Sequence, residues 1–222
     1  MKVILFGATG MIGTGALLEC LDDARVTHVL AVVRSTTGRT HPKFRELIRK
    51  DFLNYDDVRA ELTGYDACFF CLGVSSVGMD EASYTRLTYD MTIATAKALL
   101  AANQKIAFCY ISGQGADSTE QGGAMWARVK GRTENELLRM PLNAYMLRPG
   151  YIQPLRGIRS KTGWYQAFYS VLRPLYPVLR RLAAGSVTNT TNVGRAMIEL
   201  AARGSANRVL GNPEINAQAE GR

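Results

Sequence analysis

A glycine-rich loop near the start of the chain constrains its fold more than any other feature. The loop, Gly7-Ala8-Thr9-Gly10-Met11-Ile12-Gly13, directly follows an apolar run at residues 3–6 and precedes a helical pattern. In such a βα unit the first glycine permits a tight turn, the second lets backbone approach a pyrophosphate, and the third allows close helix packing. The free N–H groups at the helix start bind the anion. The alternative is a tight structural turn, but the strand–loop–helix context predicts dinucleotide binding by Gly7, Thr9, Gly10, Met11, Ile12 and Gly13.

The rest of the chain alternates short β-rich runs with longer helical patterns, which is typical of βαβ units and a parallel sheet. The predicted strands are residues 3–6, 29–33, 67–72, 106–111 and 144–147, with a weaker one at 46–50. The predicted helices are residues 11–21, 81–102 and 122–139. After Pro149 we expect a helical stretch over 164–182, a polar link over 186–192, a helix over 193–203 and an irregular tail. The fold class is therefore α/β, a Rossmann-type doubly wound parallel sheet with a small C-terminal helical elaboration.

Length and composition fit one domain. The 222 residues match the usual domain size of about 100–200 residues, so we predict a single NAD(P)-binding Rossmann domain over 1–222, with 155–190 as a lid-like segment for a substrate or partner. A content of 47% hydrophobic and 21% charged residues excludes intrinsic disorder. No apolar run approaches the ~20 residues of a membrane span, and no secretory signal is recognised. We expect a cytoplasmic protein.

The residue after the second predicted strand indicates which dinucleotide is preferred. An Asp or Glu there would bind the adenosine ribose hydroxyls and favour NAD. This chain instead has Arg34, followed by Ser35 and Thr36. A guanidinium can bind a 2′-phosphate in fork geometry, and the hydroxyls can add donors. The sequence therefore favours NADP over NAD; the alternative is a solvated surface arginine.

The net charge of +8 is unevenly distributed. Between Leu137 and Ile198 there is no Asp or Glu, and the cations are Arg139, Arg148, Arg156, Arg159, Lys161, Arg173, Arg180, Arg181 and Arg195. Such a segment attracts anions: a phosphorylated cofactor, an acidic substrate, nucleic acid or an anionic membrane. We expect no nucleic-acid partner, because no recognised binding motif is present.

Histidine and cysteine limit the metal chemistry. With His28 and His41 as the two histidines, a three-histidine site is excluded. Cys68 and Cys71 form a C-x-x-C inside a predicted strand, where residues three apart face opposite sides of the sheet. We interpret both as core cysteines and predict no metal site.

Several short motifs occur together in a characteristic order: Gly7/Gly10/Gly13, Arg34, Asp51-Phe52, Cys71-Leu72-Gly73, Ile111-Ser112-Gly113-Gln114-Gly115-Ala116-Asp117, Lys130-Gly131 and Leu147-Arg148-Pro149-Gly150-Tyr151. In these the chain resembles the atypical, NAD(P)H-binding group of the short-chain dehydrogenase/reductase superfamily, which includes NmrA-like regulators. The resemblance covers essentially the whole chain. It implies that Asp51 meets the adenine, that Leu72-Gly73 runs beneath the ribose, and that Arg-Pro-Gly ends a strand against the nicotinamide. The cofactor-binding residues implied in this way are Thr9, Asp51, Phe52, Leu72, Gly73, Lys130, Pro149 and Tyr151.

The resemblance also implies an active site, but one of its groups is replaced. The family uses a tyrosine four residues before a lysine, which lowers the phenol pKa and holds the nicotinamide ribose. Here the lysine is Lys130, but Trp126 occupies the tyrosine position, and an indole N–H does not titrate in a useful pH range. Ser112 is the candidate substrate donor, although the family register could instead place Gly113 or Gln114 there.

Two readings of this site remain open. Tyr151 could supply the missing phenol, with Tyr84 and Tyr89 as less favoured candidates, so that the predicted catalytic residues are Lys130, Ser112 and Tyr151. The chain would then reduce a small carbonyl or a related apolar or acidic substrate. Alternatively, the protein is a non-catalytic NADP(H) sensor or scaffold. The sequence does not choose between them, nor does it identify the substrate or the oligomeric state.

A basic aromatic segment precedes the last helix. Apolar residues recur at helical spacing between Tyr165 and Leu182, interrupted by Pro174 and Pro177. We favour a lid that forms an apolar substrate pocket. A docking surface for a partner or a peripheral membrane contact are the less favoured alternatives.

Overall fold

The computed structural model describes residues 1–103, 105–158 and 185–221. Its strands are β1 (Lys2–Phe6), β2 (His28–Val33), β3 (Phe44–Ile48), β4 (Ala67–Phe70), β5 (Ala107–Ile111), β6 (Asn143–Leu147), β7 (Tyr151–Gln153), β8 (Val187–Asn189) and β9 (Val209–Leu210). Seven of them form one parallel sheet in the order β3-β2-β1-β4-β5-β6-β9, and β7 pairs with β8 separately. The predicted Rossmann-type doubly wound sheet is confirmed.

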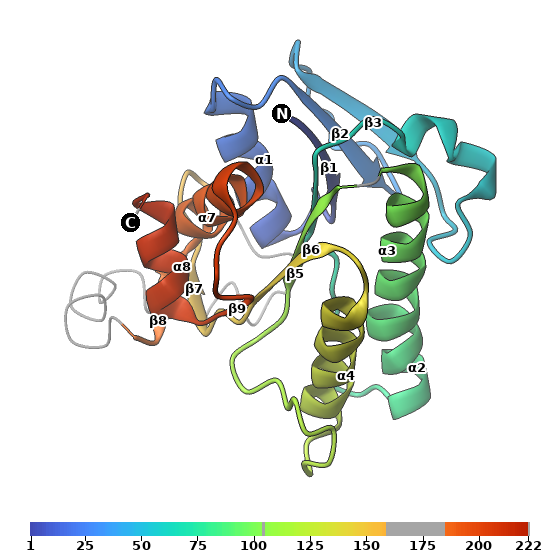
Figure 1. Ribbon diagram of the computed structural model, residues 1–222, viewed down its shortest axis with the longest axis vertical. Coiled ribbons are helices and arrows are strands. Elements are labelled where there is room, and N and C mark those ends of the chain that lie inside the picture. Colours follow the sequence, from blue (N-terminus) through green and yellow to red (C-terminus); the bar gives the residue numbers. More distant parts are fainter. Residues whose placement is uncertain (104, 159–184, 222) are drawn as a thin grey trace.

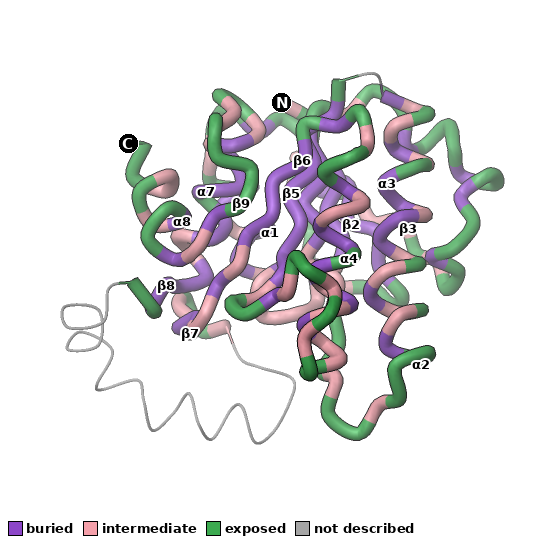
Figure 2. The backbone as a smooth tube through the Cα atoms, turned by 60° about the horizontal axis from the view of Figure 1, so that its bottom comes forward, coloured by how far each residue is buried: buried purple, intermediate pink, exposed green. Residues whose placement is uncertain are grey.

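Helices cover both faces of this sheet (Figure 1). On one face lie α1 (Met11–Asp22), α7 (Thr190–Arg203) and α8 (Asn212–Ala219); on the other lie α2 (Glu81–Thr85), α3 (Met91–Ala102) and α4 (Met125–Arg139). Alternate residues of β1 serve the two layers, because Val3 and Leu5 pack toward α1 and α7 while Ile4 and Phe6 pack toward α3. The central strands β1, β4 and β5 are therefore buried on both sides, which explains their largely apolar sequences (Figure 2).

The sheet order places the candidate site. From β1 the chain moves outward through β2 to β3, then returns to β4 on the other side of β1, so the order reverses between β1 and β4. In open parallel sheets, ligands bind outside the carboxyl ends of the strands at such a point. The loops that follow β1, β2, β4, β5 and β6 all leave from this edge.

Some element boundaries differ from prediction. The third strand begins at Phe44, two residues before the predicted start, because Phe44 pairs with Val29 on β2. β4 ends at Phe70. The predicted helix 81–102 is interrupted by a π-helical turn, η3 (Arg86–Asp90), and α4 begins at Met125, after Gly122 N–H donates to the Asp117 carboxylate at 2.7 Å. Two 3₁₀ turns, η1 (Asp56–Val58) and η2 (Ala60–Leu62), connect β3 to β4.

The prediction of an irregular C-terminal tail was wrong. β9 extends the sheet by pairing with β6, and α8 follows it. Pro213 occupies the start of α8, where its missing N–H costs nothing, and the Glu214 carboxylate accepts the Gly211 N–H at 2.9 Å. The predicted polar link 186–192 likewise contains β8 and the first turn of α7, which the Asn189 side chain caps by accepting the Asn192 N–H at 2.8 Å.

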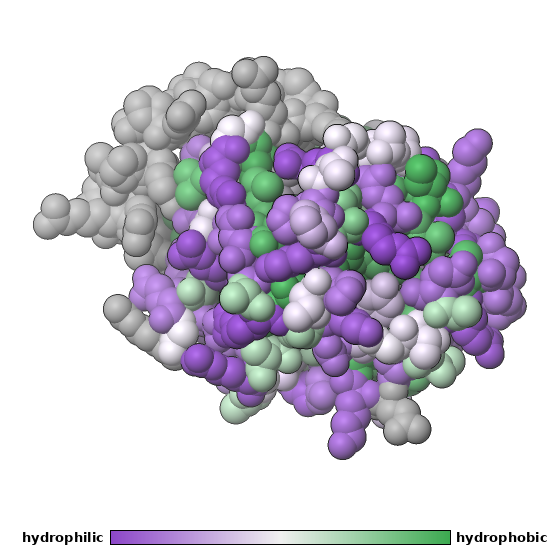
Figure 3. Space-filling view, turned by 90° about the horizontal axis from the view of Figure 1, so that it is seen from above, coloured by the Kyte–Doolittle hydropathy of each residue, from purple (hydrophilic) through white to green (hydrophobic). Residues whose placement is uncertain are grey.

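Parts of the C-terminal prediction cannot be compared with the structure. The basic aromatic stretch 164–182 lies outside the described residues, and the lid-like segment 155–190 is described only at its two ends. Among the helices of the described ranges, none combines the length and apolar character needed to cross a membrane. Seen from above, polar side chains cover most of the described surface (Figure 3).

Candidate functional site

The glycine loop joins β1 to α1 by direct backbone packing. Gly7 has a φ of +80°, in the left-handed region that favours glycine, and a Cβ there would lie 2.6 Å from the Cys71 carbonyl oxygen. A Cβ at Gly13 would lie 2.1 Å from the Gly7 carbonyl oxygen. Neither position has room for a side chain. The loop is held against the end of β4, and α1 begins directly on the loop.

This loop forms one wall of a cavity of about 270 Å³ at the switch point. Gly10 caps α1 without a side-chain hydrogen bond, and no acidic residue lies in the first turn, so the positive end of the helix dipole is not neutralised. The wall brings together the predicted residues Gly7, Thr9, Gly10, Met11, Arg34, Phe52, Leu72 and Gly73, with Val32, Val33 and Cys71 between them. These surroundings fit a dinucleotide phosphate, because the glycine backbone allows close approach and the helix start is uncapped. Ile12 and Gly13 lie behind this wall.

Arg34 is the cation of this cavity. It follows β2, is exposed, and lines the wall with Val32 and Val33. Of the two hydroxyls predicted to assist it, that of Thr36 is already engaged, since it donates to Glu46 on β3 at 2.6 Å. Thr37 donates its N–H at 2.7 Å and its hydroxyl at 2.5 Å to the same carboxylate. These hydrogen bonds hold the pKa of Glu46 below its usual value against the opposing effect of burial, so a fixed negative charge lies in the Arg34 loop.

Asp51 and Phe52 occupy different environments. Phe52 is 3% exposed, meets Phe6 edge-on with ring centroids 6.3 Å apart, and lines the cavity. Asp51 is exposed and accepts the Leu53 N–H at 2.8 Å, and it does not line the cavity. The structure therefore places Phe52, but not Asp51, against the space where a cofactor would bind.

Lys130 and Ser112 lie at the carboxyl end of β5, the next strand along the same edge. Lys130 Nζ donates to the Ile111 carbonyl oxygen at 3.3 Å and lies 5.3 Å from the centroid of the Tyr110 ring. Burial lowers the pKa of Lys130 to about 8, against the opposing attraction of Glu134. Ser112 is 6% exposed, and its N–H donates to the Leu147 carbonyl; its buried Oγ has no hydrogen-bond partner among the residues that the structure describes.

Trp126 covers the loop that leaves β5. Its ring is the nearest group to the Cβ positions of Gly113, at 3.9 Å, and Gly115, at 3.3 Å. Helix α4 is fixed in this place by Gly131, where a Cβ would lie 1.7 Å from the Asp117 carbonyl oxygen. The Lys130-Gly131 pair thus combines a candidate site residue with the glycine that brings its helix onto the loop.

The Arg-Pro-Gly-Tyr segment, residues 148–151, follows β6 at the same edge of the sheet, where the parallel strands have their carboxyl ends. The Pro149 carbonyl accepts the Gln114 N–H at 3.0 Å, and Gly150 N–H donates to the Asn212 Oδ1 at 3.1 Å. Asn212 is 2% exposed and its Nδ2 has no hydrogen-bond partner. Sequence reasoning missed Asn212, although the Asn-Pro-Glu at 212–214 was a recognisable helix start.

The three candidate tyrosines are separated from one another. The Tyr151 hydroxyl donates to Gln153 at 2.7 Å along β7. Tyr84 lies on α2, which packs against α4, and is 2% exposed. Burial raises the pKa of its hydroxyl. Tyr89 lines a different groove, of about 680 Å³, together with Leu53 and Lys97. Pro149 and Tyr151 are absent from the 270 Å³ cavity, as are Ser112 and Lys130.

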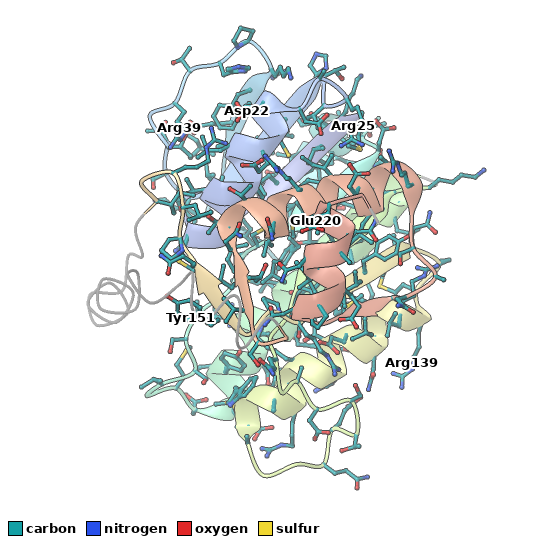
Figure 4. The ribbon with its side chains drawn as sticks, turned by 90° about the vertical axis from the view of Figure 1, so that its left-hand side faces the viewer. Asp22, Arg25, Arg39, Arg139, Tyr151 and Glu220 are labelled. Carbon is teal, nitrogen blue, oxygen red and sulfur yellow. The ribbon has the colours of Figure 1, made fainter. Side chains whose placement is uncertain are left out.

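The cations of the acid-free segment find acids elsewhere in the fold. Arg156 contacts Glu19 at 3.0 Å and Asp22 at 2.8 Å, and Arg195 contacts Glu19 at 3.0 Å. Asp22 and Arg25 lie beside α7, whereas Arg139 lies at the far end of α4 (Figure 4). Arg139 pairs with Glu136, and Arg148 with Glu134. All the cations of this segment within the described ranges are therefore paired, which weakens the anion-attracting field expected from the sequence.

The Arg148–Glu134 pair yields a stability prediction. Arg148 Nε lies 3.0 Å from both oxygens of Glu134, whose side chain is 1% exposed. Arg148→Met leaves that carboxylate buried without its cation, so we expect the free energy of unfolding to fall by about 3 kcal/mol in urea titrations. The matched control is Arg139→Met, whose pair with Glu136 is exposed, with an expected change below about 0.5 kcal/mol. Equal losses in the two variants would contradict the prediction.

The cysteines match the core interpretation in part. Cys68 is buried on the α3 face of the sheet, whereas Cys71 packs toward α1 and lines the cavity. Burial raises the pKa of both thiols. Within the described ranges, no group of three or more His, Cys, Asp or Glu residues is arranged to hold a metal ion.

Comparison with known proteins gives a matching family model and a related sequence. A family model described as NAD(P)H-binding matches residues 7–162. A Purpureocillium lilacinum protein, leucinostatins biosynthesis cluster protein T, is 27% identical over 143 residues, which is 63% of this chain and 52% of that protein. The chain thus spans about half the length of that relative.

Solved structures with the same fold include enzymes of several kinds. The Bordetella bronchiseptica enzyme WbmF in complex with NAD+ matches with a TM-score of 0.64 and 16% identity, over 99% of this chain and 76% of that one. The PhqB reductase domain from Penicillium fellutanum matches with a TM-score of 0.67 and 16% identity, over 94% of this chain and 65% of that one. At these identities the likeness shows the fold alone.

Proposed function

The chain belongs to the NAD(P)H-binding family, as its resemblance to the short-chain dehydrogenase/reductase superfamily predicted, and from this premise we propose that it binds NADP(H) and reduces a small carbonyl compound. One observation carries the proposal. The glycine-walled cavity with Arg34 lies at the switch point of the sheet, and the same edge continues to Ser112, directly after β5, and to Lys130 of α4, whose Nζ contacts the end of β5. A cofactor extended along this edge would reach from its phosphates to a lysine and a serine hydroxyl.

The residues divide into two halves along the edge. Gly7, Gly10 and the start of α1 hold the diphosphate, and Arg34 binds the 2′-phosphate. Lys130 holds the nicotinamide ribose, and Ser112, whose Oγ is unpartnered, donates to the substrate oxygen. When bound, the cofactor supplies a hydride. By resemblance to the family, we also assign Asp51 to the adenine and Pro149 and Tyr151 to the nicotinamide.

The substrate class proposed is small and apolar or acidic, bound in one Rossmann domain with residues 155–190 as its lid. The relatives named as a reductase domain and as a biosynthesis-cluster protein support chemistry on a small organic molecule. A cytoplasmic location fits this proposal.

A second candidate is a non-catalytic NADP(H) sensor. Trp126 favours it, because an indole at the position of the family's tyrosine cannot exchange a proton with a substrate. In that case the cofactor cavity serves to report redox state or to present a surface to a partner.

One comparison separates the two candidates. The protein is mixed with NADPH and a panel of aldehydes, ketones and quinones while binding is followed by fluorescence and turnover by NADPH absorbance. Turnover that Lys130→Ala abolishes supports the reductase, and micromolar NADPH binding without turnover supports the sensor. Absence of NADPH and NADH binding contradicts both.

A further inference from the structure

We infer that Lys130 Nζ itself delivers the proton to the substrate oxygen, in place of the phenol that Trp126 has displaced. This inference rests on the proposed reduction and specifies how its proton is supplied. The lysine would then have a catalytic role beyond holding the ribose.

The geometry leaves Nζ capable of further donation. An ammonium has three donors, and the described contacts engage one of them, at 3.3 Å from the Ile111 carbonyl. The titratable groups that act on it or on its neighbours are the Tyr110 ring from β5, Glu134 from its own helix, and Tyr84 from α2 beyond Tyr110. The Glu134 carboxylate is already held by the Arg148 guanidinium from the end of β6.

A buried hydroxyl on the residue that follows the Nζ contact indicates a polar ligand. Ser112 directly follows Ile111, whose carbonyl binds Nζ, and the Ser112 Oγ is buried without a partner. A buried hydroxyl without a partner costs free energy unless a ligand satisfies it. The strand before Ser112, β5, pairs with β4, and Leu72, two residues after β4, lines the cofactor cavity. A carbonyl oxygen bound between Ser112 and Lys130 would therefore adjoin that cavity.

The other candidate donors are less suitable. The Tyr151 hydroxyl is donated to Gln153. The Tyr110 hydroxyl is buried in the layer beneath, and burial raises its pKa far from neutrality. Burial instead brings the pKa of Lys130 to about 8, close to the pH at which a group can both give up and regain a proton.

The step balances with the cofactor already proposed. The carbonyl carbon receives the hydride as its π bond breaks, and the oxygen receives a proton from Nζ as the O–H bond forms. The neutral amine then regains a proton from solvent. Each carbonyl reduced to an alcohol consumes one NADPH and one proton.

The test compares Lys130→Arg with the wild-type protein. Arginine keeps the charge for the ribose but does not release a proton, since its pKa exceeds about 12. We expect NADPH affinity to change less than about threefold, whereas kcat falls at least 100-fold, within the range of general acid catalysis. In the wild type we expect kcat to fall about tenfold per pH unit above about pH 8, as Lys130 loses its proton. Lys97→Arg, an exposed lysine on α3, is the matched control and is expected to change neither quantity.

A second readout does not depend on turnover. After reductive ¹³C-methylation, NMR should show one lysine titrating near pH 8 that is absent from Lys130→Arg. Retained turnover in Lys130→Arg, or a pH limb that disappears in Tyr110→Phe or Tyr151→Phe, overturns the inference and leaves the reduction standing. NADPH binding without any turnover by the wild type overturns the proposed reduction, and this proton transfer with it.

Discussion

Gly13→Ala is expected to abolish NAD(P)H binding and to lower the free energy of unfolding by about 3 kcal/mol or more. The added methyl group would lie 2.1 Å from the Gly7 carbonyl oxygen and 2.6 Å from its carbon. Both atoms are backbone, and Gly7 is itself confined by Cys71, so no flexible side chain can move aside. The start of α1 would have to separate from the loop, and the phosphate cradle would open.

Substitutions at two other glycines serve as controls for Gly13→Ala. Gly123→Ala adds a methyl group with no atom within 4 Å, so we expect a stability change below about 0.5 kcal/mol. Gly10→Ala meets the Gly7 oxygen at 3.3 Å, a contact that small shifts can relieve, yet Gly10 lines the cavity. We therefore expect Gly10→Ala to weaken binding more than folding. Urea unfolding and NADPH titration measure both effects, and a Gly13→Ala protein that binds NADPH normally would show that this packing is not required.

The core of the fold could be predicted because its causes are local. The alternation of β-rich and helical runs indicates strands that are buried on both faces. The glycine loop indicates a backbone contact that is made within one βα unit. The C-terminal elements depend on distant partners instead. β9 is only two residues long and is a strand because it pairs with β6. β8 is likewise a strand because it pairs with β7. Helix α8 carried a readable start signal in Pro213 and Glu214, so that element was predictable in principle.

In the candidate site, too, features with local causes could be predicted and features that depend on distant residues could not. The cavity wall is built from loops that directly follow strands, so Gly7, Arg34 and Leu72 could be placed from their positions after β-rich runs. Charge pairing could not be placed in this way. Glu19 lies 137 residues from Arg156 in sequence, and Asn212 meets Gly150 across 62 residues. The segment that carries only cations in the sequence is consequently ion-paired where it is described.

Arg34→Asp is expected to reverse the dinucleotide preference. A guanidinium bound to the 2′-phosphate makes charge-assisted hydrogen bonds, each contributing about 1.5–3 kcal/mol, and aspartate replaces that attraction with repulsion. We expect NADPH affinity to fall at least 100-fold, or about 2.8 kcal/mol, while NADH affinity changes less than about threefold or improves. Calorimetric titration of both dinucleotides measures the change.

The fixed charge of Glu46 makes this test sharper. Its carboxylate, on β3, is held by Thr36 and Thr37 of the loop that carries Arg34, so the variant would add a second acid to this region with no arginine at position 34 to offset the charge. The matched control is Arg39→Asp, which makes the same charge change on an exposed residue of the same loop that does not line the cavity. A general electrostatic effect would weaken NADPH binding equally in both variants, and more so at low salt. A specific phosphate contact requires NADPH affinity to fall in Arg34→Asp and not in Arg39→Asp. If Arg34→Asp still binds NADPH far more tightly than NADH, then Arg34 does not select the cofactor.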